Sequence, residues 1–103
     1  MKKLHVIPGV CGLETTIVAE ADEDGDITLT VESTCGAVRK MIDEIEMPLD
    51  AYEAVFVKPG EGPIYEAAVK LSHGACPVPC AVLKCIEAEA GLALSKDVSM
   101  KFI

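Results

Sequence analysis

Two β-rich runs separated by a short acidic turn form the strongest folding constraint in this sequence. Residues 14–21 (ETTIVAEA) and 26–32 (DITLTVE) are rich in residues that favour strands, and Asp-Gly at 24–25 predicts a hairpin turn between them. Residues 3–7 (KLHVI) alternate between apolar and polar side chains and predict a further strand. Because these runs adjoin in the chain, we expect a mainly antiparallel sheet.

The rest of the chain predicts helices and one more strand. Residues 97–103 (DVSMKFI) alternate and predict a final strand. The sequence therefore predicts a single α+β domain over residues 1–103, with a small sheet formed by the N-terminal hairpin region and the C-terminal strand, and with helices packed on one face. Helices are expected over 36–46, over 50–57 (a short helix or a turn), over 64–72 and from 77 to about 90.

Composition and charge exclude several classes of function. The 103 residues are 50% hydrophobic and carry a formal net charge of −8, which argues against binding to nucleic acid or to anionic membrane surfaces. No run approaches the roughly 18 apolar residues that a membrane span needs. The first residues resemble a signal peptide, but His5 and Glu14 interrupt the apolar stretch, so we expect a cytoplasmic protein. The five cysteines are an odd number, which favours reduced thiols, a metal site or thiol chemistry over a disulfide framework.

The segment HGACPVPCAVLKC, residues 73–85, presents one cysteine in an unusual setting. Cys76 is expected at the N-cap of the last helix, with Pro77 and Pro79 in its first turn, where proline is tolerated. A rigid helix start with its partial positive charge would favour the thiolate, which is both the nucleophile and the metal ligand. The alternative is that Cys76 packs inside the protein as a small hydrophobe.

Three cysteines share the same kind of position. Cys11 in PGVCGLE, Cys35 in STCGAV and Cys76 all lie beside Gly or Pro at a junction between expected elements. This placement predicts one shared site at one end of the sheet, which would bind zinc or an iron–sulfur species. His73 is a candidate fourth ligand; alternatively, it is a cation at the end of the preceding helix.

The remaining candidates are expected to support the structure. Cys80 follows Cys76 by about one helical turn and is expected in the core or just behind the site. Cys85 lies on the opposite face of the helix and is expected to pack in the core. His5 is expected to be structural, and Glu14 could reach the site from beside Cys11.

The layout of these cysteines resembles that of the IscU/NifU iron–sulfur cluster assembly scaffolds. A Cys-Gly before a hairpin, a Cys-Gly after the third strand and a Cys at the start of the last long helix correspond to Cys11, Cys35 and Cys76. The family's histidine directly precedes its last cysteine, whereas position 75 here is alanine and His73 lies two positions earlier. The resemblance implies that the three cysteines receive sulfur and iron or hold zinc, and that a sulfur donor or an iron–sulfur acceptor protein is the partner.

Two further resemblances leave the function open. The local sequence CPVP is similar to the Cys-Pro-x-Pro helix start of TusA-like sulfur carriers, which implies a persulfide on Cys76. The layout from P-G-x-C-G to A-C-P-V-P is also similar to a small prokaryotic family without an assigned function. The leading hypothesis is a metal-binding protein, and the alternatives are a sulfur carrier or thiol-transfer protein acting through Cys76 and a non-catalytic interaction module with packed cysteines. Enzymatic turnover, the metal and the oligomeric state stay open, with a non-enzymatic role favoured.

Overall fold

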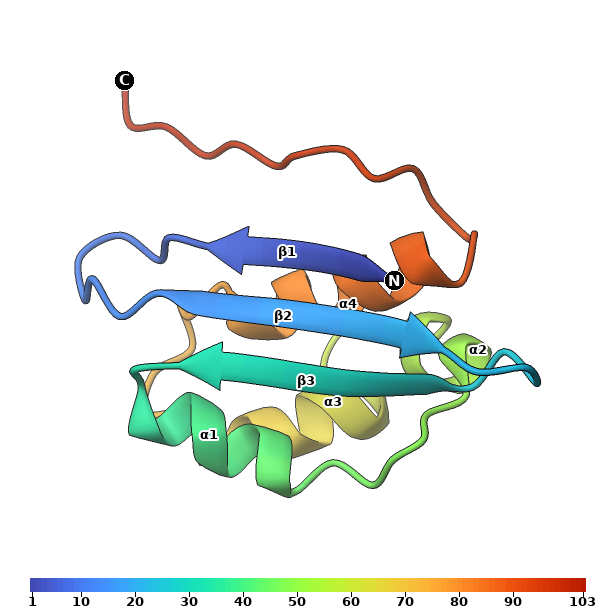
Figure 1. Cartoon of the computed structure of the whole chain (residues 1–103). Coiled ribbons are helices and arrows are strands. Elements are labelled where there is room, and N and C mark those ends of the chain that lie inside the picture. Colours follow the sequence, from blue (N-terminus) through green and yellow to red (C-terminus); the bar gives the residue numbers. More distant parts are fainter.

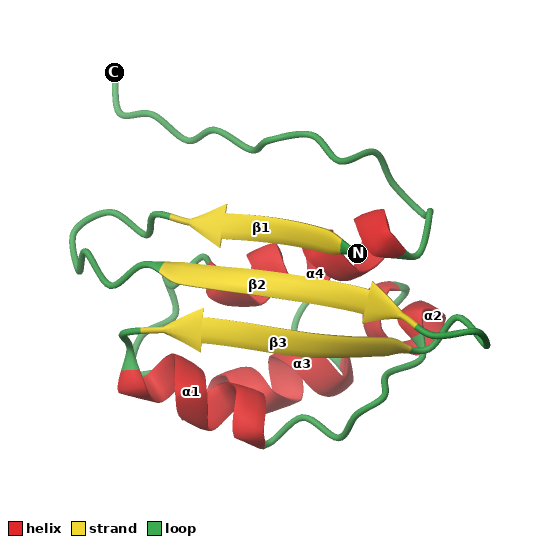
Figure 2. Ribbon diagram, viewed as in Figure 1, coloured by secondary structure: helices red, strands yellow, loops and turns green.

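Three strands form one antiparallel sheet in the order β1-β2-β3. The computed structural model describes all residues 1–103 and confirms the α+β class, with helices packed on one face of the sheet (Figures 1 and 2). The strands are β1 (Lys2–Val6), β2 (Thr15–Ala21) and β3 (Ile27–Ser33). The helices are α1 (Gly36–Asp43), α2 (Ala51–Val55), α3 (Gly62–Ala67) and α4 (Val78–Glu89), with a 3-10 turn η1 (Ala68–Lys70) after α3.

The hairpin between β2 and β3 is formed by the acidic turn that the sequence indicates. One carboxylate oxygen of Asp22 accepts hydrogen bonds from the backbone N–H groups of Asp24 and Asp26, at 2.9 and 3.0 Å. Gly25 has φ +85°, a conformation that glycine adopts at low cost. The Asp22 carboxylate and Gly25 therefore close the hairpin that the sequence predicted.

The core lies between the sheet and the helices. Thr15, Ile17 and Ala19 alternate along the central strand as buried residues, and all three point toward the helical layer. None of the helices has the length and apolar character that crossing a membrane requires. The core consists of Val6, Ile17, Ala19, Ile27, Leu29, Val38, Met41, Ile45, Leu49, Ala51, Ala54, Ile64, Ala67, Val78, Val82, Cys85 and Ile86.

Helix α4 runs from one end of the sheet to the other. Near its C-terminus, Glu89 accepts a hydrogen bond from the backbone N–H of Ala21, at the end of β2. The 12 residues of α4 span about 18 Å. Its N-terminus therefore lies at the opposite end of the sheet, where β1 ends, β2 begins and β3 ends (Figure 1). We call these the Glu89 end and the cysteine end of the sheet.

The predicted C-terminal strand is absent. Residues 97–103 form an extended tail without regular secondary structure, and Figure 1 shows this tail running past β1 on the outside of the fold. Alternation of apolar and polar side chains indicates that a segment is able to pair, but a strand also needs a hydrogen-bonded neighbour. No backbone hydrogen bond joins the tail to any strand of this chain.

Helix boundaries also differ from those expected. Helix α1 stops at Asp43, because the chain tightens into i→i+3 hydrogen bonds such as Ile45 N–H to Ile42 O, at 3.1 Å. The predicted helix over 64–72 begins earlier, at Gly62, and passes into the 3-10 turn that ends at Lys70. The predicted short helix over 50–57 is confirmed as α2.

Candidate functional site

Cys76 lies one residue outside the helix that it was expected to cap. Pro77 is the N-cap of α4, and its carbonyl accepts the first helical hydrogen bond, from Ala81 N–H at 3.0 Å. The fixed φ of proline already suits a helix, so the first turn closes on Pro77 rather than on Cys76. Cys76 is half-buried, and its side chain packs against the edge of the core.

A groove of about 440 Å³ opens beside Cys76. Its walls come from α3, η1, the connecting segment and the first turn of α4, and six of the nine lining residues are hydrophobic. The groups in the groove that could act as nucleophiles or metal ligands are the Cys76 and Cys80 thiols and the His73 imidazole. The lining residues are Tyr65, Ala68, Val69, Leu71, His73, Gly74, Cys76, Pro79 and Cys80.

Two residues of this groove differ from expectation. Cys80 is exposed and is not part of the core, because the buried stripe of α4 follows Val78, Val82 and Ile86 at four-residue spacing. His73 was expected at a helix end, but η1 stops before it, so the residue lies in the connecting segment. Both side chains thus border the groove.

Cys11 projects from a tight turn at the cysteine end. The N–H of Gly12 donates to the carbonyl of Gly9 at 3.0 Å, which closes a turn with Val10 and Cys11 at its tip. Both glycines have positive φ, +96° for Gly9 and +66° for Gly12. Val10 and Cys11 are exposed, so the turn presents the thiol to solvent.

Cys35 is the N-cap of α1. Its backbone N–H donates to Ser33 Oγ at 3.1 Å, and its carbonyl accepts from Arg39 N–H at 3.2 Å. Its thiol makes no capping hydrogen bond, and the side chain is half-buried. Cys35 therefore follows β3 and begins α1 through its backbone groups, while its sulfur takes no part in the cap.

The fold brings the three junction cysteines to one end but does not gather their sulfurs into a metal site. Cys11 follows β1, Cys35 follows β3 and Cys76 precedes α4, and these three junctions lie at the cysteine end (Figure 1). All five cysteines are free thiols. No three His, Cys, Asp or Glu side chains of the chain are arranged to hold a metal ion. In this arrangement, the predicted ligands Cys11, Cys35, Cys76 and His73 do not form a coordination site.

Cys85 has the packing role expected of it. Its side chain is buried, and its sulfur lies 3.5 Å from Lys2 O and 3.8 Å from Ile17 O. Burial raises the pKa of the Cys85 thiol, because desolvation disfavours the thiolate. Cys85 is therefore held as a neutral thiol away from solvent.

His5 of β1 links this strand to the start of β2 through side-chain contacts. The His5 ring contacts Thr16 Oγ1 at 2.9 Å and the Glu14 carboxylate at 2.5 Å. His5 thus has the structural role expected of it. Glu14 bonds to His5 rather than to any of the cysteines.

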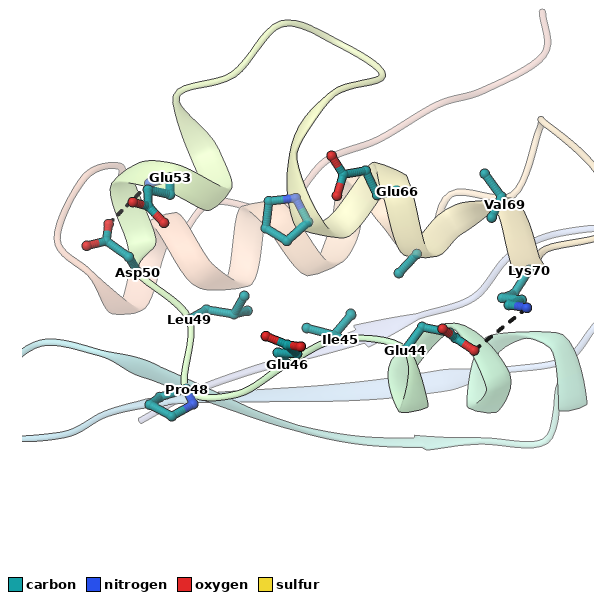
Figure 3. A pocket seen from close by; sticks show the side chains of 12 residues that line it. Glu44, Ile45, Glu46, Pro48, Leu49, Asp50, Glu53, Glu66, Val69 and Lys70 are labelled. Carbon is teal, nitrogen blue, oxygen red and sulfur yellow. Dashed lines mark hydrogen bonds and ion pairs between the residues drawn. The ribbon is translucent and has the colours of Figure 1, made fainter.

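A second groove contains a set of carboxylates that the sequence did not single out. It measures about 530 Å³, and Figure 3 shows carboxylates from α2, α3 and the segment between α1 and α2 around it. Lys70 lies 3.7 Å from Glu44, and Asp50 accepts a hydrogen bond from Glu53 N–H at 3.1 Å. These acids are spread over separate elements, so only the fold brings them together. The carboxylates are Glu44, Glu46, Asp50, Glu53 and Glu66.

Comparisons with known proteins give one match. No curated protein and no solved structure matches the chain significantly. Residues 2–102 match a family described as a family of unknown function, DUF6951. This match covers nearly the whole chain, and the protein therefore belongs to the DUF6951 family.

Proposed function

We propose that this protein is a small cytoplasmic thiol carrier that holds a transferable sulfur atom on Cys76. The observation that carries this proposal is the position of Cys76, half-buried at the start of α4 and opening into a mostly apolar groove. Pro77 and Pro79 restrict the backbone on the C-terminal side of the thiol. The carrier gives the sulfur to a partner protein and turns over no substrate of its own.

The other thiols are less suited to this role. Cys11 and Cys80 are exposed, so a persulfide there would be open to any thiol in solution. Cys85 is buried and has a raised pKa, which keeps it out of reach of a donor. Cys35 is half-buried but does not line the groove. Cys76 combines partial shelter with an opening through which a donor can approach.

The carrier step needs a protein persulfide as the sulfur donor. The Cys76 thiolate attacks the outer sulfur of the donor persulfide, a new S–S bond forms, and the donor cysteine leaves as its thiolate. Cys76 becomes a persulfide, and no net oxidation occurs. The acceptor protein takes the outer sulfur by the same step in reverse. The apolar groove would shelter the persulfide between these two encounters.

Mass spectrometry after loading tests the proposal. The reduced protein is treated with sodium tetrasulfide, freed of excess reagent and measured intact, and peptide mapping then locates the added sulfur. We expect one added sulfur atom on Cys76 in the parent and in Cys80→Ser, which leaves the rest of the groove intact. We expect none in Cys76→Ser. Equal retention of sulfur by Cys76→Ser, or retention on Cys11 in preference to Cys76 once excess reagent is removed, would contradict a carrier role for Cys76.

Metal binding is the second candidate. The observation in its favour is that the junctions carrying Cys11, Cys35 and Cys76 share one end of the sheet. Thiolates suit zinc and iron–sulfur clusters, with His73 as a possible fourth ligand and a sulfur donor or cluster acceptor protein as partner. Sulfurs around zinc lie roughly 3.8 Å apart, so the loop carrying Cys11 would have to move toward α4.

Anaerobic purification with metal and acid-labile sulfide analysis tests the second candidate. If it holds, each chain carries about one zinc or an iron–sulfur chromophore, and Ser replacements at Cys11, Cys35 and Cys76 each remove most of it. Cys85→Ser is the control and keeps the metal, because Cys85 contacts the other end of β1. Metal-free protein from every preparation, together with sulfur loading at Cys76, would exclude metal binding and favour the carrier role.

A further inference from the structure

The C-terminal tail exposes apolar side chains that a folded chain normally covers. Val98, Met100 and Phe102 have relative exposures of 58%, 82% and 108%. In an extended strand, these three alternate residues project from one face. The tail thus has the pattern of a half-buried strand and lacks both the neighbouring strand and the cover that such a strand requires.

The open edge of β1 offers the missing neighbour. β1 pairs with β2 and with no strand on its other side. The opposite edge of the sheet is partly closed, because Ile27 of β3 exchanges hydrogen bonds of 2.8 and 2.7 Å with Leu49. An unpaired edge is a template for strand addition.

The surface beside β1 is apolar and incompletely covered. Leu4 of β1 is half-buried, although it packs against the core. Ala81 and Ala88 are four positions before and three positions after Cys85, whose sulfur contacts the β1 backbone, so they lie on the same flank of α4. Both are small and half-buried. Apolar side chains from an added strand could therefore pack beside β1 against α4.

The topology disfavours pairing of the tail with β1 of its own chain. In Figure 1, the tail and β3 run in the same direction, and the helices lie behind the sheet. If the tail paired with β1 of its own chain, it would be a strand parallel to β3 at the far edge of the sheet. The chain would then reach it from β3 by a connection through the helices. With the helices on that side, the connection would be left-handed, whereas about 98% of such connections are right-handed.

The exposed area is large enough for a stable dimer. The chain exposes 6892 Å², whereas a folded monomer of 10.9 kDa is expected to expose about 5,600 Å². The excess is about 1,300 Å² per chain. Two chains have about 2,600 Å² of such surface, so covering half to three quarters of it would bury the roughly 1,200 to 2,000 Å² of a specific interface.

We propose that this protein forms a strand-exchanged dimer, in which residues 97–103 of each chain add a strand to the β1 edge of a second copy. The face carrying Val98, Met100 and Phe102 then packs against Leu4 and the adjoining flank of α4. Exchange of identical segments in this way closes a symmetric dimer and leaves neither tail exposed. This inference does not depend on the role of Cys76.

Light scattering coupled to gel filtration tests the exchange. We expect the full chain to have twice the mass of one copy, and a chain that stops at Ser95 to have the mass of one. The double variant Val98→Asp with Phe102→Asp should also be monomeric. Its control, Ser99→Asp with Lys101→Asp, places two carboxylates on the opposite face of the strand, adds one more negative charge than the test variant because Lys101 is lost, and should still remain dimeric.

Hydrogen exchange distinguishes strand exchange between two chains from pairing of the tail within one chain. Amides of β1 and of the tail should be protected in the dimer, and protection of the β1 edge should fall in the chain that stops at Ser95. A monomeric full chain with protected tail amides would mean pairing within one chain and would overturn the exchange. A monomer with unprotected tail amides, or a dimer that survives removal of the tail, would overturn it as well.

Discussion

The two ends of the sheet are built in different ways. At the Glu89 end, the Glu89 carboxylate accepts a hydrogen bond from Ala21 N–H at 2.9 Å and lies 3.1 Å from the α-amino group of Met1. At the cysteine end, a glycine turn exposes Cys11, and Cys76 borders an open groove. The contacts of one end hold α4 to the sheet, whereas the other end presents thiols that no polar contact occupies. The molecule thus separates the residues that fix α4 from those available for chemistry.

The first prediction compares the thiols of the two ends and concerns the largest effect. Cys85 should react with iodoacetamide more than about a thousandfold more slowly than Cys11, because labelling a buried thiol requires opening that approaches global unfolding, about 5 kcal/mol or more. The raised pKa of Cys85 slows it further. Cys76 should react at an intermediate rate. Timed labelling followed by peptide mass spectrometry gives each rate.

A denaturant series is the control for this comparison. The rate at Cys85 should rise steeply with urea concentration, and the rate at Cys11 should stay nearly constant. Comparable rates for the two thiols in native buffer would mean that the Glu89 end is as open as the cysteine end.

The second prediction concerns the carboxylate that closes the Glu89 end. Replacing Glu89 by Ala should lower the free energy of unfolding by about 2 kcal/mol at neutral pH, since it leaves the Ala21 N–H without its partner. The Glu89 side chain is only 10% exposed, so water replaces the contact poorly. Glu87→Ala is the matched control and should cost under about 0.5 kcal/mol, because Glu87 only approaches Lys84 at 3.9 Å on the surface.

The contact between Glu89 and Ala21 also predicts how the free energy of unfolding depends on pH. The hydrogen bond from Ala21 N–H is the main cause that lowers the pKa of Glu89. A lowered carboxyl pKa in the folded state stabilises the fold above the unfolded value of about 4.3, and this stability disappears as the pH falls through the folded value. The difference between parent and Glu89→Ala should therefore narrow below about pH 4. A difference that stays constant down to acid pH would exclude the ionised contact as its source. Urea unfolding of the parent and of Glu89→Ala across this pH range measures the difference.

The sequence predicted the secondary-structure elements better than it predicted the side-chain contacts at the cysteine end. The β-rich runs 14–21 and 26–32, with Asp-Gly between them, predicted the hairpin because turn chemistry and strand propensity agree locally. Pro77 and Pro79, which a first helical turn tolerates, indicated the start of α4 for the same reason. Junction positions of cysteines follow from such local signals, whereas the approach of their sulfurs depends on loop conformations that no local pattern fixes.

The features that the sequence did not reveal depend on distant residues. Glu89 and Ala21 are 68 positions apart, and nothing in either segment indicates their hydrogen bond. The strand predicted over 97–103 failed within one chain for a related reason. Its pattern describes an ability to pair, while the partner depends on topology and, in our proposal, on a second copy.

The last prediction compares Glu89 with the exposed carboxylate at the cysteine end, where the expected effect is smallest. Glu14 pairs with His5, and the two side chains are 54% and 50% exposed. Water competes for both groups, so Glu14→Gln should change the free energy of unfolding by no more than about 0.5 kcal/mol. Salt at about 1 M should weaken this pairing, because the screening length falls there to about 3 Å, close to the separation of the two groups. The loss in Glu89→Ala should persist in salt, since it comes from a sheltered N–H that loses its acceptor. Urea unfolding of both variants at low and high salt makes the test. Equal costs for the two carboxylates, or a Glu89 effect that salt abolishes, would mean that the two ends are held by the same kind of surface charge pairing.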